Sequence, residues 1–227
     1  MGLDKKNKRM PAILKKVISH DMLPINELDF YDSEWNEWLN RINAGFKAEE
    51  NRLKELVDGA TEEYAEVLAE DYWLAKNISG NMYAALIVSV WAKIERFLRS
   101  LCRYCTCFGV QAIDNNPNIV AFSNYFDQTL GINLQTIKHC QSANALRVLS
   151  NAFKHNDCHY KPDSFPIDKS LAEEYGIAKC QSHTSCRIEY INLPVKEMIL
   201  AAGSFCKELL EKTEAELKTK TQNEQQA

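Results

Sequence analysis

Hydrophobic residues recur every three to four positions along most of this chain, which is the spacing of amphipathic helices. The pattern predicts a short helix over residues 11–20 and a longer helical stretch that Asp32 or Ser33 opens and Gly59 interrupts. The apolar positions of that stretch are Trp35, Trp38, Leu39, Ile42, Phe46, Leu53, Leu56, Val57, Tyr64, Val67, Leu68 and Trp73. The N-terminal third of the chain is therefore predicted to be mainly helical.

The rest of the chain shows the same helical period, with clearer signals for where each helix starts and ends. A loop is predicted at 77–81, followed by the most apolar helix, 83–105, which we expect to be the central core helix. Further helices are predicted over 117–131, with Pro117 at the start and Gly131 as the stop, over about 135–155, and from Pro194 to about residue 217.

Strand signals are few. Residues 186–191 alternate like one short strand, and we expect them to pair with part of 158–168 as a small hairpin. Because helical signals dominate, the predicted fold class is all-α: a helical bundle with an N-terminal helical extension and at most a small β-hairpin.

Charge is distributed unevenly along the chain. The formal net charge is −4, but residues 27–74 hold 14 acidic and 4 basic side chains, whereas 75–161 hold 9 basic and 4 acidic ones. An acidic run is typical of the solvated face of a helix. The basic region permits a polyanion as partner.

Composition and pattern together predict four parts. These are a basic N-terminal segment (1–26), an acidic helical extension (27–76), a helical bundle (77–217) and a polar, disordered tail (218–227).

The chain shows no sign of secretion or membrane insertion. No segment resembles a signal peptide, and the longest uncharged run, 78–92, is shorter than the roughly 20 apolar residues that a bilayer requires. We therefore expect a cytoplasmic protein without a membrane span. In that compartment the eight cysteines are expected to be reduced and mostly buried.

Several classes of chemistry lack their motifs. The P-loop, Rossmann, zincin and hydrolase-elbow signatures are absent. Cysteines at 102, 105 and 107, and the run His155-x-x-Cys158-His159, have spacings that zinc accepts, but these cysteines also fit ordinary apolar positions. We predict no metal and no cofactor. Most aromatic residues fall on the apolar stripes of predicted helices, which gives no support to a stacking platform for bases.

The most informative polar pattern lies in residues 144–155. At 100° per residue, one face collects Ala145, Leu146, Val148, Leu149, Ala152 and Phe153, and the other collects Asn144, Arg147, Ser150, Asn151, Lys154 and His155. Arg147, Asn151 and His155 share one stripe. An imidazole near neutral pKa beside a guanidinium suits phosphodiester chemistry. Alternatively, Lys154 and His155 only face the negative end of the helix dipole.

At these residues the chain resembles the HEPN superfamily. The run Ser150-Asn151-Ala152-Phe153-Lys154-His155 is similar to the family motif R-x4–6-H, commonly seen as Arg-Asn-Ala-x-Lys-His. Residues 89–102, in which Glu95 precedes a Phe-Leu pair, are similar to an earlier core helix of the family. Ser150 stands at the arginine position, and Arg147 lies one turn upstream of it, so the motif is degenerate.

The resemblance implies a small helical bundle that acts as a dimer in defence, stress or toxin–antitoxin systems, as a metal-independent endoribonuclease. It assigns proton transfer to His155, charge stabilisation to Arg147 or Lys154, and orientation of groups to Asn151 and Glu95. The implied partners are RNA, a second copy and a cognate partner or antitoxin protein. The alternative is a catalytically degenerate module for dimerisation, partner binding or nucleotide binding.

Overall fold

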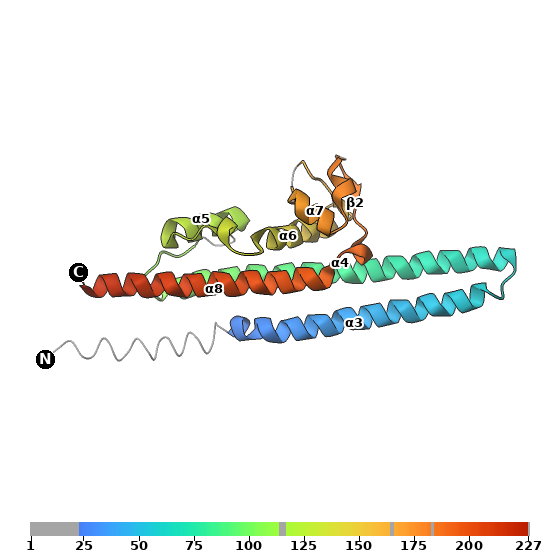
Figure 1. The fold of residues 1–227 in the computed structure, drawn as a ribbon, viewed down its shortest axis with the longest axis horizontal. Helices are drawn as coiled ribbons and strands as arrows, with labels where there is room; N and C mark the ends of the chain where they lie inside the picture. The colour runs from blue at the N-terminus through green and yellow to red at the C-terminus, as the bar shows by residue number, and fades with distance from the viewer. Residues whose placement is uncertain (1–22, 114–116, 164–165, 183, 227) are drawn as a thin grey trace. The chain divides into compact units, whose positions relative to one another are not determined.

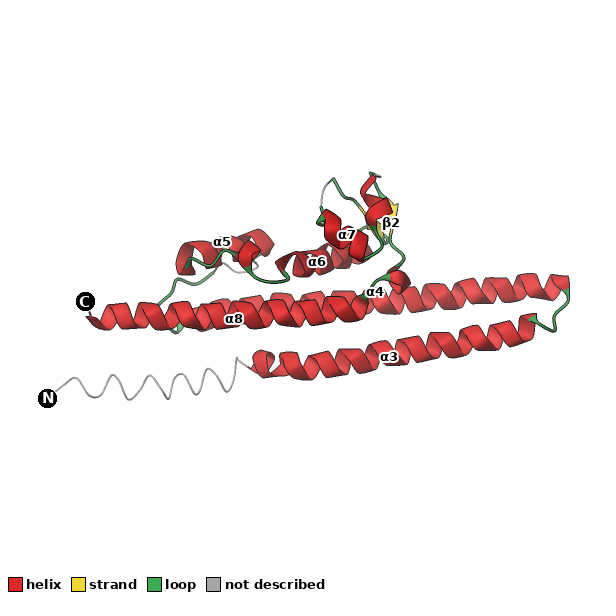
Figure 2. Cartoon of the chain, viewed as in Figure 1, coloured by secondary structure: helices red, strands yellow, loops and turns green. Residues whose placement is uncertain are grey.

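The computed structural model describes residues 23–113, 117–163, 166–182 and 184–226 (Figure 1). Over these ranges the protein is all-α, and its strands form a single two-stranded antiparallel pair (Figure 2). The predicted fold class is confirmed at this level. The predicted helix at 11–20 and most of the basic segment 1–26 lie outside the described residues. None of the described helices combines the length and the apolar character needed to cross a membrane.

The described residues form two compact units. Unit 1 draws on 23–31, 92–140 and 201–226, and unit 2 consists of 32–91 and 141–200. Two long helices, α4 (Glu62–Thr106) and α8 (Val195–Gln226), contribute residues to both units.

The helix α3 (Leu23–Val57) ends at a short turn that leads into α4, as the sequence predicted for Gly59. Its start differs from the prediction, since the helix already includes Asp32 and Ser33 and neither residue opens it. Pro24 in the first turn is compatible with this earlier start, because the first turn of a helix needs no backbone N–H from that position.

Within unit 2, α3 and the first part of α4 pack as an antiparallel helical hairpin (Figure 1). The rings of Phe46 and Tyr72 lie 6.4 Å apart between centroids. The Tyr83 hydroxyl donates a hydrogen bond to the Asn43 side chain. Buried residues on the two helices, among them Leu39, Ile42, Leu53, Leu68 and Ile87, form this part of the core.

The loop predicted at 77–81 is wrong, because α4 is helical throughout this stretch. Ser79 and Tyr83 are buried while Asn77 and Asn81 are exposed, so the inward stripe continues through the polar segment. Packing of that stripe outweighs the weak helix propensity of Asn and Gly. The predicted boundary at 76/77 therefore falls inside one helix, and the division between the units falls after Trp91.

Unit 2 is completed by short elements around α6 (Cys140–His155), of which residues 141–155 belong to it. They are β1 (His159–Tyr160), α7 (Lys169–Glu174), the 3-10 turn η2 (Ala178–Ser182), β2 (Cys186–Arg187), the 3-10 turn η3 (Tyr190–Asn192) and the start of α8. In the antiparallel pair, His159 lies opposite Arg187 and Tyr160 opposite Cys186. The predicted pairing is confirmed, although the strand is shorter than expected because Tyr190–Asn192 coil into η3.

The start of α6 comes later than the predicted residue 135. A 3-10 turn, η1 (Leu134–Thr136), precedes it, and His139 adopts a left-handed backbone with φ 60°. A continuous helix cannot pass through a left-handed residue, so α6 begins after it.

In unit 1, α5 (Ile119–Leu130) carries a cap at each end. The Asn118 side chain accepts a hydrogen bond from the Ala121 N–H at 2.9 Å. Gly131 adopts φ 69°, and its N–H returns to the Asp127 carbonyl. The predicted stop at Gly131 is confirmed by this left-handed C-terminal cap.

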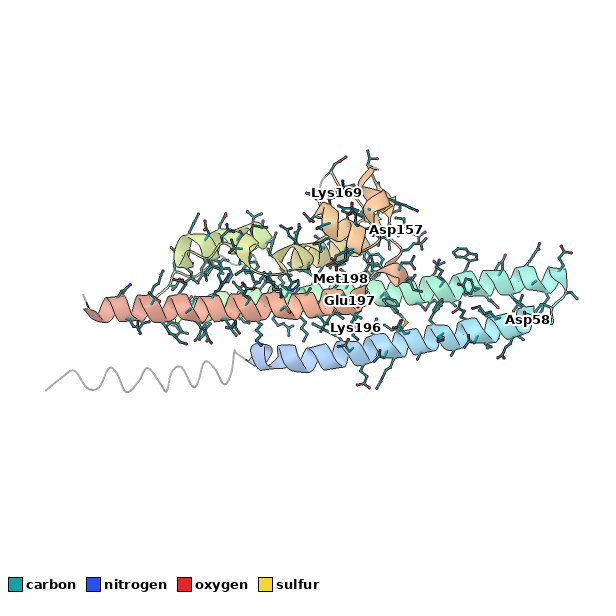
Figure 3. The ribbon with its side chains drawn as sticks, in the orientation of Figure 1. Asp58, Asp157, Lys169, Lys196, Glu197 and Met198 are labelled. Carbon is teal, nitrogen blue, oxygen red and sulfur yellow. A yellow bond between two sulfur atoms is a disulfide. The ribbon has the colours of Figure 1, made fainter. Side chains whose placement is uncertain are left out.

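The last helix, α8, starts directly after Pro194, as predicted. In its first turn Met198 is fully buried whereas Lys196 and Glu197 are exposed (Figure 3). The helix continues to Gln226, so the expected disordered tail from residue 218 is not found. Leu217 is buried, and the Lys220 ammonium donates a hydrogen bond to the Thr129 carbonyl. These two contacts hold the end of the helix against unit 1.

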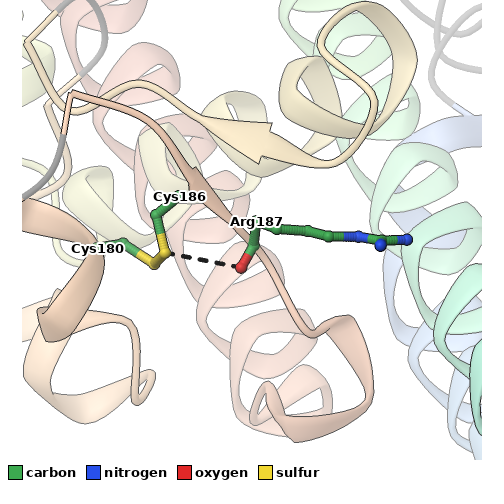
Figure 4. Close-up of a disulfide and its surroundings, with 3 residues drawn as sticks. All are labelled: Cys180, Cys186 and Arg187. Atoms are coloured by element: carbon green, nitrogen blue, oxygen red, sulfur yellow. Dashed lines mark hydrogen bonds between the residues drawn. A yellow bond between two sulfur atoms is a disulfide. The ribbon is translucent and has the colours of Figure 1, made fainter.

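The expectation that all cysteines are reduced is wrong for one pair. Cys180 and Cys186 form a disulfide across six positions of sequence, joining η2 to β2 (Figure 4). The separation in sequence is short enough for local structure to bring the two thiols together. The remaining six cysteines form no disulfide with a described residue, and Cys102, Cys105 and Cys206 among them are buried.

Candidate functional site

The core face predicted for residues 144–155 is confirmed in α6. Ala145, Leu146, Val148, Leu149 and Ala152 are all buried, and Phe153 is partly buried against the ring of Tyr190 at 5.9 Å between centroids. The Tyr190 hydroxyl, also buried, donates to the Leu149 carbonyl at 2.6 Å. These contacts fix the rotation of α6 and thereby determine which side chains face outward.

Ser150 does not lie on the polar face where the sequence analysis placed it. Its exposed fraction is 0%, and its hydroxyl has no hydrogen-bond partner among the described residues. At 100° per residue this position lies at the border of the two faces, and neighbouring elements cover it. The position at which the HEPN motif carries arginine is thus inside the core of unit 2.

Arg147 lies on the outer side of α6 and is partly buried. Its Nε and Nη2 donate to the Asn144 Oδ1 at 3.1 and 2.9 Å, and burial lowers the pKa of the guanidinium. Arg147 and His155 are separated by roughly 12 Å along the axis at 1.5 Å per residue. The guanidinium is therefore held near Asn144 rather than at the imidazole.

The other predicted residues of the stripe remain accessible. Asn151 is partly exposed, and Lys154 and His155 are exposed in the last turn of α6. Neither Lys154 nor His155 has a hydrogen bond or ion pair to another described residue. The helix ends with the N–H groups of Asn156 and Cys158 both donating to the Ala152 carbonyl. Both basic side chains thus occupy the position that the helix dipole favours for cations.

Glu95 belongs to unit 1, whereas residues 141–155 belong to unit 2, and its carboxylate forms an ion pair with Arg99 at 2.9 Å on the same helix. Glu95 is thus engaged in an i, i+4 pair on the surface of α4. Within unit 2, the structure brings Asn151, Lys154 and His155 to one exposed end of α6 and holds the Arg147 guanidinium at Asn144 instead.

The cysteines whose spacing zinc would accept lie partly in the core. Cys102 and Cys105 are buried, and burial raises the pKa of the Cys102 thiol far above its usual value and that of Cys105 to about 11. Zinc requires thiolates, so these two are poor ligands as they stand. Across the described residues, no three His, Cys, Asp or Glu side chains gather as a metal site would need.

Sequence reasoning missed a pocket in unit 2. It has a volume of about 290 Å³ and is lined from α4 by Trp73, Lys76, Asn77 and Asn81, and from the segment around β2 by Arg187 and Glu189. We call it the Trp73 pocket. Its α4 residues recur at helical spacing, a signal that the predicted loop at 77–81 concealed.

The Trp73 pocket contains an ion pair and a cation–π contact. The Lys76 Nζ lies 3.6 Å from the Glu189 Oε2 and 5.0 Å from the centroid of the Trp73 ring. Glu189 also accepts a hydrogen bond from the Asn192 side chain at 2.8 Å. Arg187 is exposed and forms no ion pair with any residue that the structure describes.

A second hollow of about 390 Å³ lies between α3 and α4 in the same unit. Leu74, Ile78 and Met82 of α4 line it. Together with Tyr64 and Val67, which lie earlier on the same helix, they form a row of five exposed large apolar side chains spaced three, four or seven residues apart. We call this set the α4 stripe. Each member is between 42% and 58% exposed, and two of them, Tyr64 and Val67, are among the apolar positions that predicted the helix.

Comparison of the chain with protein-family models, with curated proteins and with solved structures finds no significant match.

Proposed function

We propose that this chain is a HEPN-like helical module that acts by binding, and that its α6 lacks the arginine–histidine pair of an RNA-cleaving site. The burial of Ser150 supports this proposal. An arginine at that position would place a guanidinium in the apolar core, at a cost that no described partner offsets. The basic group nearest in sequence on the stripe, Arg147, is hydrogen-bonded to Asn144 instead.

Acid–base catalysis also requires groups within hydrogen-bond reach of one another or of the substrate, which is about 2.6–3.2 Å. One copy of α6 offers an exposed imidazole with no second titratable group held against it. A module that binds a partner does not need such a pair, so the degenerate motif agrees with a binding role.

The partner that the α4 stripe fits best is a second copy of this chain. Monomeric proteins rarely expose a contiguous row of large apolar side chains, and the spacing of this row is that of a helix-packing seam. The rim also carries both signs of charge, with Glu49 and Arg52 on α3 and Asp71 on α4. A pair related by a two-fold axis presents the same face from both copies, so each copy brings both signs of charge to the rim. A second copy of the chain is therefore the partner that we propose first.

The dimer is tested by light scattering coupled to size exclusion. Wild-type protein is expected at twice the chain mass of 26.0 kDa at micromolar concentrations. The double variant Leu74→Glu/Ile78→Glu should be monomeric, because it places two charges in the seam. Val120→Glu, at an equally exposed apolar residue of α5 in unit 1, is the matched control and should leave the mass unchanged. A monomeric wild type, or a double variant that stays dimeric, contradicts the proposal.

A second candidate is the metal-independent endoribonuclease that the HEPN resemblance implies, with its site completed across a dimer. The observation in its favour is the exposure of His155 and Lys154 side by side at the end of α6, in a chain region whose net charge is basic. In this proposal His155 moves protons at the ribose 2′-hydroxyl, Lys154 or Arg147 offsets charge on the phosphorane, and Asn151 and Glu95 orient groups. A cytoplasmic defence or toxin–antitoxin role, with an antitoxin as partner, belongs to this candidate.

The two candidates differ in an RNA-cleavage assay in EDTA. The endoribonuclease leaves 2′,3′-cyclic phosphate ends, and His155→Ala abolishes them, whereas Lys196→Ala, which removes an exposed charge from α8, does not. Cleavage that depends on His155 would replace the binding proposal. Equal inertness of the wild type and His155→Ala over varied RNAs would support it.

A further inference from the structure

The Trp73 pocket is formed by one copy of the chain, and its Trp73 wall lies on a different face of α4 from the α4 stripe. At 100° per residue, Trp73 and Gly80 point about 100° or more away from Leu74 and Ile78, whereas Asn77 and Asn81 lie at the border between the two faces. What the pocket binds is therefore a question separate from dimerisation and from RNA cleavage.

Trp73 offers a flat apolar surface to this pocket. Its side chain is 58% exposed, although its spacing in the sequence suggested a core position. An indole left in water at the wall of a cavity is an unusual use of the largest apolar side chain, and it suits the stacking of a planar ring. The Lys76 ammonium lies over the Trp73 ring, 5.0 Å from its centroid, and covers part of that face. The rest of the indole surface is left accessible.

The charges of the pocket favour an anion with hydroxyl or amino groups. Arg187 and Lys76 outnumber Glu189, and Arg187 has no carboxylate partner among the described residues. A guanidinium with free N–H groups matches the oxygens of a phosphate in a bidentate manner. Glu189, whose side chain is 62% exposed, is an acceptor for sugar hydroxyls or for an amino group.

Two amides also line the pocket. Asn77 and Asn81 lie one helical turn apart on α4, both exposed toward the pocket rim. Each amide both donates and accepts, which is the combination that the edge of a nucleobase requires.

The wall opposite α4 is firmly held. The N–H of Ile188 donates to the Cys158 carbonyl at 2.9 Å, and His159 pairs with Arg187 in the two-stranded sheet. Cys186, next to Arg187, is tied to Cys180, and its Sγ lies 3.7 Å from the Arg187 carbonyl (Figure 4). The Arg187 side chain extends away from the disulfide in that view. A fixed backbone reduces the entropy lost when the guanidinium engages a ligand.

We propose that the Trp73 pocket binds a phosphorylated nucleoside, with the base stacked on Trp73, the phosphate on Arg187 and Lys76, and the sugar or base edge on Asn77, Asn81 and Glu189. The volume of about 290 Å³ suits one nucleotide, since it lies at the low end of the range of small-molecule sites. The nucleotide is either free or one residue of a single-stranded RNA, and the same side chains read both.

The test is calorimetric titration of the full chain, in EDTA, with five probes. These are AMP, CMP, adenosine, inorganic phosphate and a 5′-phosphorylated tetranucleotide of single-stranded RNA. We expect saturable one-to-one binding of at least one mononucleotide, with adenosine and phosphate each at least tenfold weaker. A tetranucleotide that binds more than tenfold more tightly identifies RNA as the source, and one that binds no more tightly identifies the free nucleotide.

Variants decide whether the Trp73 pocket is the site. Trp73→Ala and Arg187→Gln are each expected to weaken binding at least tenfold, with unchanged helical circular dichroism. Trp38→Ala, at a similarly exposed tryptophan outside the pocket, is the control and should bind like the wild type. The absence of saturable binding of every probe, or equal affinity of the Trp73, Arg187 and Trp38 variants, overturns the proposal. Leu74→Glu/Ile78→Glu should still bind, so failure of the dimer proposal and of this one are distinguishable.

Discussion

Single residues in unit 2 show which buried positions the pattern of polar and apolar residues predicts and which it does not. The sequence correctly placed Leu146, Leu149 and Ala152 in the core, because their burial follows from helical spacing alone. It misplaced Ser150, which is buried at the border of the polar face, and Trp73, which is 58% exposed on an apolar stripe, since either position is buried or exposed according to what covers it. That depends on neighbouring elements, which spacing does not contain.

Ser150 leads to a stability prediction. Ser150→Ala removes a buried hydroxyl without a described partner and should leave the free energy of unfolding unchanged or raise it by about 1 kcal/mol. Ser150→Arg, which would restore the HEPN motif in sequence, should lower it by about 3 kcal/mol or more, because it buries a charge. Urea unfolding followed by circular dichroism measures both. A stable Ser150→Arg variant would show that this position can open to solvent.

Thiol environments give a prediction that depends on pH. Because burial raises the pKa of Cys105 to about 11, and raises that of Cys102 further, neither thiol ionises near neutrality in the folded protein. Exposed Cys107 should therefore react with iodoacetamide at pH 8 long before these two do, since the thiolate is the reacting form. Mass spectrometry of timed samples gives the order. Equal rates for all three in the folded protein would contradict the buried positions.

At the scale of elements, the predicted helices were mostly found, and the errors lie at polar interruptions. Gly131 was correctly identified as a stop because a left-handed cap favours glycine strongly. Residues 77–81 were misassigned because Asn, Ser and Gly are common in loops, and the inward contacts of Ser79 and Tyr83 that keep them helical are tertiary. Local propensity cannot reveal that tertiary contacts keep such a segment helical.

Two glycines test this distinction in one experiment. Gly80→Ala should raise the free energy of unfolding by about 0.5–1 kcal/mol, because the residue is inside α4 and an added Cβ meets no atom within 4 Å. Gly131→Ala should lower it by about 1 kcal/mol, because φ 69° disfavours a Cβ. Both are read from denaturant midpoints. If Gly80→Ala destabilises the protein, residues 77–81 are not helical in solution.

At the scale of the whole molecule, the sequence indicated one bundle with an extension, whereas the chain forms two units that share α4 and α8. A shift in charge near residue 75 suggested a boundary there, but charge marks the solvated face of a helix and not where its contacts change. The disulfide was missed because the compartment argument treats all cysteines alike and ignores which pairs lie close together.

The disulfide is open to direct measurement. Trypsin releases residues 180–187 as one peptide, so an intact Cys180–Cys186 bond should appear as a mass two units below the reduced form, with neither cysteine alkylated under non-reducing conditions. The six other thiols should all be alkylated after unfolding. Alkylation of residues 180 and 186 in freshly purified, unreduced protein would show that the pair is open.

The sharing of α4 and α8 between the units also constrains how the chain can be cut or inherited. Unit 2 is built from two separate stretches of sequence and unit 1 from the stretches around them. A single break anywhere in the chain therefore cannot release either unit whole. The same holds for recombination between genes, because a single crossover cannot transfer unit 2, with its Trp73 pocket, as a whole.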